Sequence, residues 1–354
     1  MGCIVNVWMH FVNTVLRKVK AVDLVSAAGL RARLARVSER LVECVPNFSE
    51  GRRTEVVDDL AAAVASTRGI RLLDQTSDAN HNRSVLTFAG PPADVAAAME
   101  KATEVAVARI DMSSHQGEHP RLGAVDVVPF VPLGQTTMDE TVELARDFGR
   151  RIAERFDLPV YLYARAATRP EREVLADIRR PQFEGLKALI AQAAHAPDFG
   201  PPRVHPTAGA MVVGARPFLI AYNINLESRD LELAKRIARR VRERSGGLPR
   251  VQALGLYMAD LDCAQVSMNL LDHEVTPLWL VWETVDALAA ADGVEIKESE
   301  LIGLCPLAAL TEVADHIDAA PDAPVEERIT EAARWLHVRD FVPTMALELR
   351  LGSA

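Results

Sequence analysis

The chain has 354 residues, enough for two domains of ordinary size, each with its own core. Apolar residues make up 49% of it, charged residues 25% and aromatic residues 5%, which is typical of a soluble globular protein. The formal net charge of −9 argues against nucleic-acid binding, so an anionic ligand would need a local cluster of arginines or backbone N–H groups. The four cysteines, at positions 3, 44, 263 and 305, show no paired spacing, which argues against a disulfide framework or a zinc site and fits the cytoplasm.

The first 37 residues differ in composition from the rest. They hold six Lys or Arg residues and a single acid, Asp23. An apolar stretch, 4–16, has no positive charge before it, so the order of features is wrong for a secretory signal. We interpret 1–37 as an N-terminal extension, disordered or an artefact of an over-long gene prediction; the alternative is a transit-type or surface-binding amphipathic leader.

The first half of the chain predicts alternating strands and helices. Apolar runs and periodicity indicate strands and helices in the order strand, helix, strand, strand, helix, strand, then a further helix and strand. The ranges are 41–46, 54–67, 70–74, 84–89, 94–110, 125–131, 138–156 and 160–164. The first six elements have the order of a split β-α-β unit, the ferredoxin-like arrangement.

The second half repeats this kind of order without a residue-by-residue repeat. Residues 172–194 are predicted to be helical, and the Pro- and Gly-rich stretch 196–209 reads as a constrained connector. Strands are predicted at 210–213, 218–223, 251–258, 265–270 and 301–307, and helices at 231–245 and 278–291. The sequence therefore predicts an α/β (α+β) protein of two ferredoxin-like lobes, each a β-sheet with helices on one face, and a cleft between them.

Two histidines, His115 and His119, stand four residues apart just before the buried strand 125–131. On a helix this spacing would suit a metal pair, but Gly117 and Pro120 favour a loop, and no cysteine or carboxylate cluster completes a ligand set. We therefore expect no metal. A general acid–base role for one imidazole is favoured, since it titrates near neutral pH, and the other then has a structural role in the turn.

A second polar loop, 78–83, lies between two predicted strands. Its residues include Asp78, His81, Asn82 and Arg83. It is either a solvated turn or, placed beside the histidine loop, a source of Arg83 for a carboxylate and Asn82 for a polar ligand edge.

Two further segments have an ordinary and a functional interpretation. Ser49 follows a strand and precedes a helix, so it is a helix N-cap or part of an anion site. Ser267 and Asn269 share one face of a predicted strand, which is usual for a half-buried strand.

Six segments, read together and in order, resemble the formiminotransferase family, whose members are glutamate formimidoyltransferases. They include LVECVPNFSEG at 41–51, NRSVLTF at 82–88 and GEHPRLGAVDVVPF at 117–130. The others are APDFGP at 196–201, GARPFLIAYNINL at 214–226 and AQVSMNLLD at 264–272. In mammals this family is fused to a cyclodeaminase, and this chain is too short to hold that second domain.

The resemblance implies transfer of the formimino group from N-formimino-L-glutamate to N5 of tetrahydrofolate, in the degradation of histidine to glutamate. Tetrahydrofolate is then a co-substrate, and no metal is required. The family's catalytic histidine corresponds to His119. A single imidazole can accept the proton of N5 and return it to the leaving nitrogen. We expect His115 and Arg121 to orient His119 or hold substrate carboxylates, with Asn47, Asp78, His81, Asn82 and Arg83 as further substrate or supporting residues.

The resemblance also places folate binding in the connector. The family's folate segment corresponds to ten consecutive positions: Gly200, Pro201, Pro202, Arg203, Val204, His205, Pro206, Thr207, Ala208 and Gly209. Mammalian relatives have an acidic residue at the position of Thr76, an aromatic one at that of Ala208 and threonine at that of His81. Asp78 can supply the acid through a two-residue shift.

The remaining expectations concern organisation and partners. The domains are 1–37, the extension; 38–209, the N-terminal lobe with its connector; 210–330, the C-terminal lobe; and 331–354, a tail. The partners are small molecules, without nucleic acid or membrane, and the resemblance implies a homodimer. The rival hypotheses are formyl transfer, hydrolysis of formiminoglutamate, or folate binding without turnover.

Overall fold

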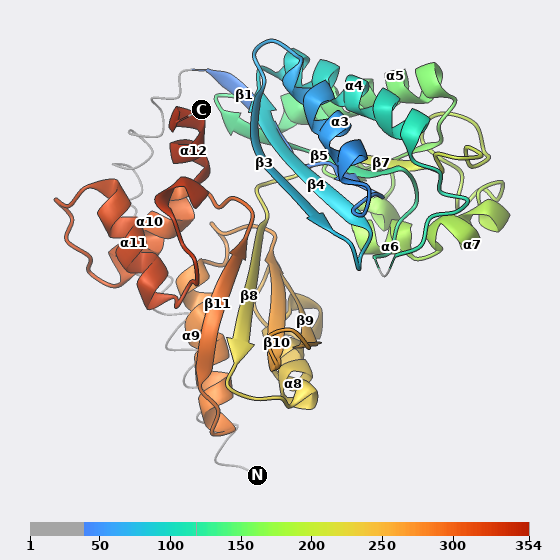
Figure 1. Ribbon diagram of the computed structural model, residues 1–354. Coiled ribbons are helices and arrows are strands. Elements are labelled where there is room, and N and C mark those ends of the chain that lie inside the picture. Colours follow the sequence, from blue (N-terminus) through green and yellow to red (C-terminus); the bar gives the residue numbers. More distant parts are fainter. Residues whose placement is uncertain (1–38, 118, 354) are drawn as a thin grey trace. The chain divides into compact units, whose positions relative to one another are not determined.

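The computed structural model describes residues 39–117 and 119–353, so the interpretation of 1–37 lies outside the described residues. Seven strands form the first sheet (Figure 1). From one edge the sheet runs β3, β4, then β1 with β2, then β5, β7 and β6. The strands are β1 (Arg40–Cys44), β2 (Asn47–Phe48), β3 (Arg71–Asp78), β4 (Arg83–Gly90), β5 (Val125–Gly134), β6 (Val160–Ala164) and β7 (Met211–Ala215).

Three helices cover one face of this sheet (Figure 1). They are α3 (Thr54–Ala65), α4 (Pro92–Arg109) and α5 (Met138–Phe156). Their buried residues form the main core with alternate residues of the strands, such as Val128, Leu162 and Val213. Helix α5 begins at a capping box, in which Thr137 and Glu140 satisfy each other's backbone N–H groups.

Two short helices lie on the opposite face, over β5, β6 and β7, so the expectation of helices on one face alone is wrong here. They are α6 (Leu175–Arg179) and α7 (Gln182–Leu189), which follow the 3₁₀ turn η1 (Pro170–Arg172). Leu186 of α7 packs with Val127 and Tyr161, which alternate with residues of the main core and so point to the other side of the sheet. The helical stretch predicted at 172–194 divides at Pro181, which cannot continue a helix from Arg179.

The second sheet has four antiparallel strands in the order β11, β8, β10, β9. The strands are β8 (Ile220–Leu226), β9 (Val251–Met258), β10 (Cys263–Leu270) and β11 (Ile296–Ile302). Helices α8 (Leu231–Val241) and α9 (Leu278–Ala291) lie along this sheet, with the 3₁₀ turn η2 (Glu243–Ser245) after α8 (Figure 1). The antiparallel strands of the two sheets have the same order. In the first sheet this order is β5, then β1 with β2, then β4 and β3; in the second it is β11, β8, β10 and β9.

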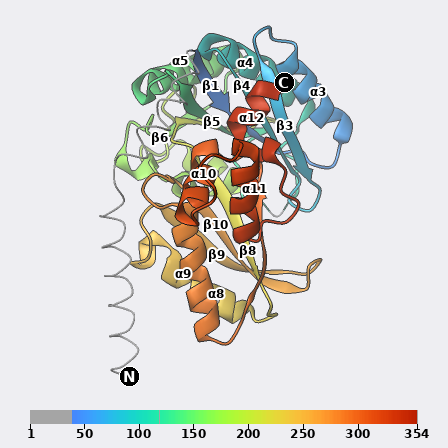
Figure 2. The same cartoon turned by 90° about the vertical axis from the view of Figure 1, so that its left-hand side faces the viewer.

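The C-terminal part returns to the first sheet. It consists of α10 (Leu307–His316), α11 (Val325–Trp335), the 3₁₀ turn η3 (Pro343–Met345) and α12 (Leu347–Ser353). Leu347 is buried with Leu73, Ala89 and Leu304, and α12 lies beside β3 in both ribbon views (Figures 1 and 2). The expected tail boundary at 331 falls inside α11.

Most predicted elements are confirmed, and two differ in position. The strand predicted at 301–307 is β11, five residues earlier, because Pro306 precedes a helix at 307–316. The strand predicted at 210–213, which was assigned to the C-terminal lobe, is β7, and it pairs in parallel with β5 and β6 of the first sheet. Of the helices in the described part of the chain, none is long and apolar enough to cross a membrane.

Candidate active site

The histidine segment is a loop, as its Gly and Pro residues predict, and it leads into β5. It borders a narrow, closely packed hollow. The lining residues come from three parts of the sequence, 48–49, 81–83 and 115–126: Phe48, Ser49, His81, Asn82, Arg83, His115, His119, Arg121 and Asp126. Six of the predicted site residues are thus brought together: His81, Asn82, Arg83, His115, His119 and Arg121.

His119 is the half-buried imidazole of this hollow. Burial lowers its pKa to about 3, and repulsion from Arg83, Arg179 and His81 acts in the same direction. The ring of His81 meets it edge-on, with 6.5 Å between the ring centroids. His119 is therefore neutral at physiological pH and can accept a proton.

His115 is fixed by hydrogen bonds on both ring nitrogens. Arg121 Nε donates to its Nδ1 at 3.2 Å, so the ring proton is on Nε2, which lies 3.0 Å from the carbonyl oxygen of Asn82. Burial is the main cause that lowers the pKa of His115. Because both ring nitrogens are hydrogen-bonded to protein groups, the His115 ring stabilises the conformation of the loop.

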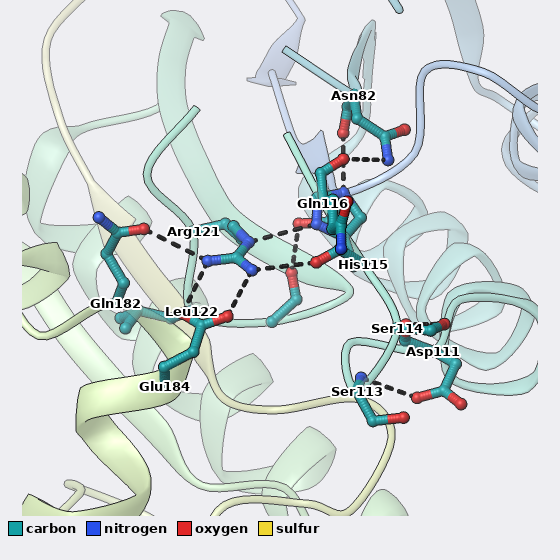
Figure 3. Close-up of polar contacts among 12 residues, drawn as sticks. Asn82, Asp111, Ser113, Ser114, His115, Gln116, Arg121, Leu122, Gln182 and Glu184 are labelled. Carbon is teal, nitrogen blue, oxygen red and sulfur yellow. Dashed lines mark hydrogen bonds and ion pairs between the residues drawn. The ribbon is translucent and has the colours of Figure 1, made fainter. Parts of the chain in front are cut away.

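Arg121 is buried and bound to protein groups on every side (Figure 3). Its two terminal nitrogens form a bidentate pair with Glu184 of α7 at 2.9 and 2.6 Å, and Nη1 also donates to Gln182 at 3.3 Å. Nη2 donates to the carbonyl of His115 at 3.2 Å. The hydrogen bond from Arg121 lowers the pKa of Glu184. This guanidinium thus ties the histidine loop to α7.

Asn82 joins three segments at the edge of the hollow. Its Oδ1 accepts from the backbone N–H of Gly51 at 3.0 Å, and its Nδ2 donates to the carbonyl of Gln116 at 2.9 Å. Its φ of 49° is in the left-handed region, which asparagine tolerates. Gly51 is required for this close approach, because a Cβ there would lie 2.3 Å from the carbonyl oxygen of Asp78.

The rest of the 78–83 loop is more exposed. Asp78 accepts from the backbone N–H groups of Asn80 and His81 at 2.8 and 2.9 Å, and its other oxygen lies 2.8 Å from His81 Nδ1. These bonds, the one from the His81 backbone first, lower the pKa of Asp78. Among the described residues, Asp78 is not part of the hollow's lining.

Two predictions about the segment after β1 have different outcomes. Asn47 lies on β2 and donates to the carbonyl of Val45 at 3.1 Å, and within the described chain it does not line the hollow. The interpretation of Ser49 as an N-cap is wrong, since α3 begins at Thr54 and the hydroxyl of Ser49 donates to the carbonyl of Gly123 at 2.8 Å. Instead, the Glu50 carboxylate accepts from the N–H groups of Arg52 and Arg53.

Asp126 and Arg179 belong to the site, and the sequence analysis did not identify them. Asp126 is buried on β5 and accepts from the backbone N–H of Leu122 at 2.7 Å. Its second oxygen forms an ion pair with Arg179, the last residue of α6. An acidic residue inside the apolar run 124–133 was the available signal for Asp126, whereas Arg179 had none.

The connector 200–209 contacts the histidine loop at its C-terminal end. The backbone N–H of Ala124 donates to the carbonyl of Ala208, and that of Ala210 donates to Leu122, at 2.9 and 3.0 Å. His205 Nδ1 accepts from the backbone N–H of Ala208 at 2.9 Å, which closes the turn. In the described chain, none of these ten residues lines the hollow around His119.

The N-terminal end of the connector lies at a second, shallow hollow. This hollow has about 310 Å³ and is bordered by Arg150, Ala153, Glu154, Asp157, Phe199, Gly200 and Pro201. Arg203 forms an ion pair with Asp157 at 2.6 Å on this side. Ser267 and Asn269 lie on β10 of the second sheet, away from both hollows. Among residues 39–117 and 119–353 there is no cluster of three or more potential metal ligands.

Comparison with known proteins gives matches over most of the chain. Residues 41–216 match the N-terminal subdomain of the formiminotransferase domain, and residues 221–334 match the formiminotransferase domain. Glutamate formimidoyltransferase of Streptococcus pyogenes is 42% identical over 82% of this chain and 98% of its own length. That of Thermoplasma acidophilum is 47% identical over 78% of this chain and 91% of its own.

A fused relative matches over part of its length. Formimidoyltransferase-cyclodeaminase of Sus scrofa is 48% identical over 78% of this chain, which corresponds to 52% of the pig protein. Among solved structures, the periplasmic protease PqqL of Escherichia coli covers 89% of this chain and 40% of its own, but a TM-score of 0.18 at 10% identity bears on neither fold nor function.

Proposed function

Because the chain belongs to the formiminotransferase family, we propose that it transfers the formimino group of N-formimino-L-glutamate to N5 of tetrahydrofolate, a step of histidine degradation. The observation that carries the proposal is His119, a neutral, half-buried imidazole in a hollow whose surroundings are cationic. This is the group that the reaction needs, since a proton has to leave N5 and another has to reach the departing nitrogen.

The proposed reaction uses His119 twice. N5 of the folate attacks the amidine carbon and its proton passes to the imidazole, which gives a tetrahedral adduct. The imidazolium then protonates the nitrogen of the glutamate portion, the bond between that nitrogen and the carbon breaks, and glutamate leaves with an amino group. Protons balance over the cycle, and the products are 5-formiminotetrahydrofolate and glutamate.

The surrounding residues support His119 by position. His115, Arg121 and Glu184 hold the loop on one side, and Asn82 holds it to the segment of Gly51 on the other. We assign these residues a positioning role, because their polar atoms are occupied by protein groups. His81 and Arg83 line the hollow and are assigned to the substrate.

Tetrahydrofolate, the co-substrate, is assigned to the connector 200–209. Support comes from the backbone hydrogen bonds that join Ala208 and Ala210 to the histidine loop, and from Arg203, a cation for the folate's glutamate tail.

The strand order supports two ferredoxin-like lobes, and the cleft between them is part of this proposal. A homodimer in the cytoplasm remains a prediction.

The decisive test is glutamate release by the purified chain with formiminoglutamate, with and without tetrahydrofolate. We expect release to depend on tetrahydrofolate, and His119→Ala to lower kcat by ~10²- to 10⁴-fold. His195→Ala, which changes a histidine just before the connector and outside the hollow's lining, is the matched control. Release without folate would mean hydrolysis, a formylated folate product would mean formyl transfer, and full activity of His119→Ala would refute the catalytic assignment.

A further inference from the structure

Arg83 and Arg179 are two arginines near His119: Arg83 lines the hollow with His119, and Arg179 pairs with Asp126, which also lines it. Both arginines repel the protonated form of His119, and Arg179 also repels Arg83. The carboxylate that pairs with Arg179 is that of Asp126. Among the described residues, the carboxylate of Asp126 is thus the one buried anion beside these two cations. Residue 118 lies outside the described part.

Among the described residues, polar groups of both arginines lack protein partners. The side chain of Arg179 is 14% exposed, and its Nε has no hydrogen-bond partner. Arg83 borders the hollow, and among the described residues its guanidinium makes no hydrogen bond or ion pair. A buried guanidinium without a full set of acceptors is costly unless a ligand supplies them.

A purely structural role for Arg179 would be to hold Asp126, whose other oxygen accepts from the Leu122 backbone. That role uses one terminal nitrogen of Arg179 and leaves Nε and Arg83 unexplained. Arg121 shows what a structural arginine looks like in this fold: its guanidinium is satisfied by Glu184, Gln182 and His115. Arg83 differs from Arg121 in having no partner among the described residues while lining the hollow beside Asp126, and this contrast points to a ligand at the arginine pair.

We infer that Arg179 and Arg83 together bind a carboxylate of the formimino donor and so place its amidine carbon at His119. This inference rests on the proposed function. The donor carries two carboxylates, one of them bonded to the same carbon as the nitrogen that leaves, so an anion held next to the imidazole brings the reacting bond with it. Asp126 is then a positioning residue, because one of its oxygens pairs with Arg179 and the other accepts from the backbone N–H of Leu122.

The test is a comparison of Arg179→Met and Arg179→Lys with Arg180→Met. Arg180 is the neighbouring residue, is 78% exposed and pairs with Asp177, so it is a matched control. We expect Arg179→Met to raise the KM for formiminoglutamate by ~10- to 100-fold, the effect of losing a charge-assisted hydrogen bond. The KM for tetrahydrofolate should stay within about twofold, and Arg179→Lys should be intermediate.

A binding measurement separates this inference from the proposed function. Glutarate, a dicarboxylate, and glutaramide, its uncharged analogue, are titrated calorimetrically into the wild type and Arg179→Met. We expect the wild type to bind glutarate at least tenfold more tightly than glutaramide, and the variant to bind both equally weakly. Should the wild type show no transferase activity but retain this difference, the proposed function would fail while the carboxylate site stands.

The pH profile provides a third measurement. The charged groups around His119 are Arg83, Arg179 and His81, with Asp126 and Asp78 behind them. Removing the Arg179 charge should move the acid limb of kcat/KM to higher pH, because His119 is then protonated more easily. This shift tests whether the Arg179 charge acts on His119, and the donor KM and the glutarate affinity test whether Arg179 also binds a carboxylate.

Three results would overturn the inference. A rise in the KM for tetrahydrofolate alone would assign the arginine pair to the folate's own carboxylates. An equal loss of thermal stability and of every kinetic parameter would leave Arg179 as a brace for Asp126. Unchanged donor KM and glutarate affinity in a folded Arg179→Met would show that the pair binds no carboxylate.

Discussion

At the scale of residues, His119 is set apart from His115 by what surrounds each ring. Both are half-buried histidines of one loop. His115 has hydrogen bonds at both nitrogens, whereas His119 faces two guanidinium groups in a hollow. Two residues of the same type in one segment thus have different surroundings, and the proposed division of roles between them follows from this difference.

The low pKa of His119 has a consequence for acid stability. In the unfolded chain the imidazole takes up a proton near pH 6.5, but in the folded chain it does so only near pH 3. Between these values the unfolded state binds more protons, so the free energy of unfolding falls as the pH is lowered. We expect His119→Gln to lose less stability than the wild type between pH 6.5 and 4, as measured by urea unfolding. Parallel curves for the two proteins would contradict the shifted pKa.

The sequence predicted His119 because a family motif surrounds it, and predicted the loop because Gly117 and Pro120 interrupt regular structure. It could not predict the partners of Arg121, since Glu184 is 63 positions away and comes close only when α7 packs on the sheet. The same holds for Arg179, a residue of a polar stretch whose neighbour Arg180 looks equivalent in sequence. Side chains brought in by tertiary packing leave no local pattern.

At the scale of elements, the C-terminal helix α12 was not predicted, because its seven residues are too few for a clear helical period. Helix α12 is instead stabilised by tertiary contacts. Leu347 is 1% exposed among Leu73, Ala89 and Leu304, and its backbone N–H donates to Cys305 at 2.9 Å. Glu348 accepts from the N–H of Leu307, at the start of α10.

This packing predicts the cost of truncating Leu347. Leu347→Ala should lower the free energy of unfolding by about 2–5 kcal/mol, the range for a buried leucine that leaves a cavity. Val342→Ala is the matched control, because Val342 is 51% exposed and should change stability by less than about 0.5 kcal/mol. Denaturant titration of both variants checks this. Equal, small effects would mean that α12 does not stabilise the fold.

At the scale of the whole molecule, the two-lobed α/β organisation was predictable, because strand and helix signals alternate in the same order in both halves. The boundary between the halves was harder to place. The strand β7 completes the first sheet in parallel with β5 and β6, and its pairing depends on contacts with residues more than 45 positions away. A run of apolar residues does not say which sheet it joins.

A buried carboxyl group near the N-terminal end of the described chain interacts electrostatically with a carboxyl group near its C-terminal end. Glu43 of β1 is 1% exposed, and its pKa is raised to about 7 by burial, against the attraction of Arg216 and with added repulsion from Glu348 of α12. The folded state therefore binds a proton between about pH 4.5 and 7 that the unfolded state does not, and stability is lost as the pH rises through this range.

Replacing Glu43 by an uncharged residue should remove this loss of stability at higher pH. Glu43→Gln is expected to be more stable than the wild type by about 3 kcal/mol at pH 8, and similar to it at pH 4.5. Thermal unfolding across this range measures the difference, with the exposed Glu55→Gln as control. A variant less stable than the wild type at pH 8 would show that Glu43 is ionised and well paired.

The backbone bonds between the connector and the catalytic loop have one more consequence. Ala124 and Ala208, and Ala210 and Leu122, are joined as in a short ladder, so a shift of one segment alone would break hydrogen bonds to the other. If folate orders the connector as proposed, these hydrogen bonds also order the histidine loop, which binds the formimino donor. Thermodynamic linkage then requires reciprocity: whatever factor folate adds to the donor's affinity, the donor adds to that of folate. The two substrates would bind cooperatively although they need not touch the same side chains.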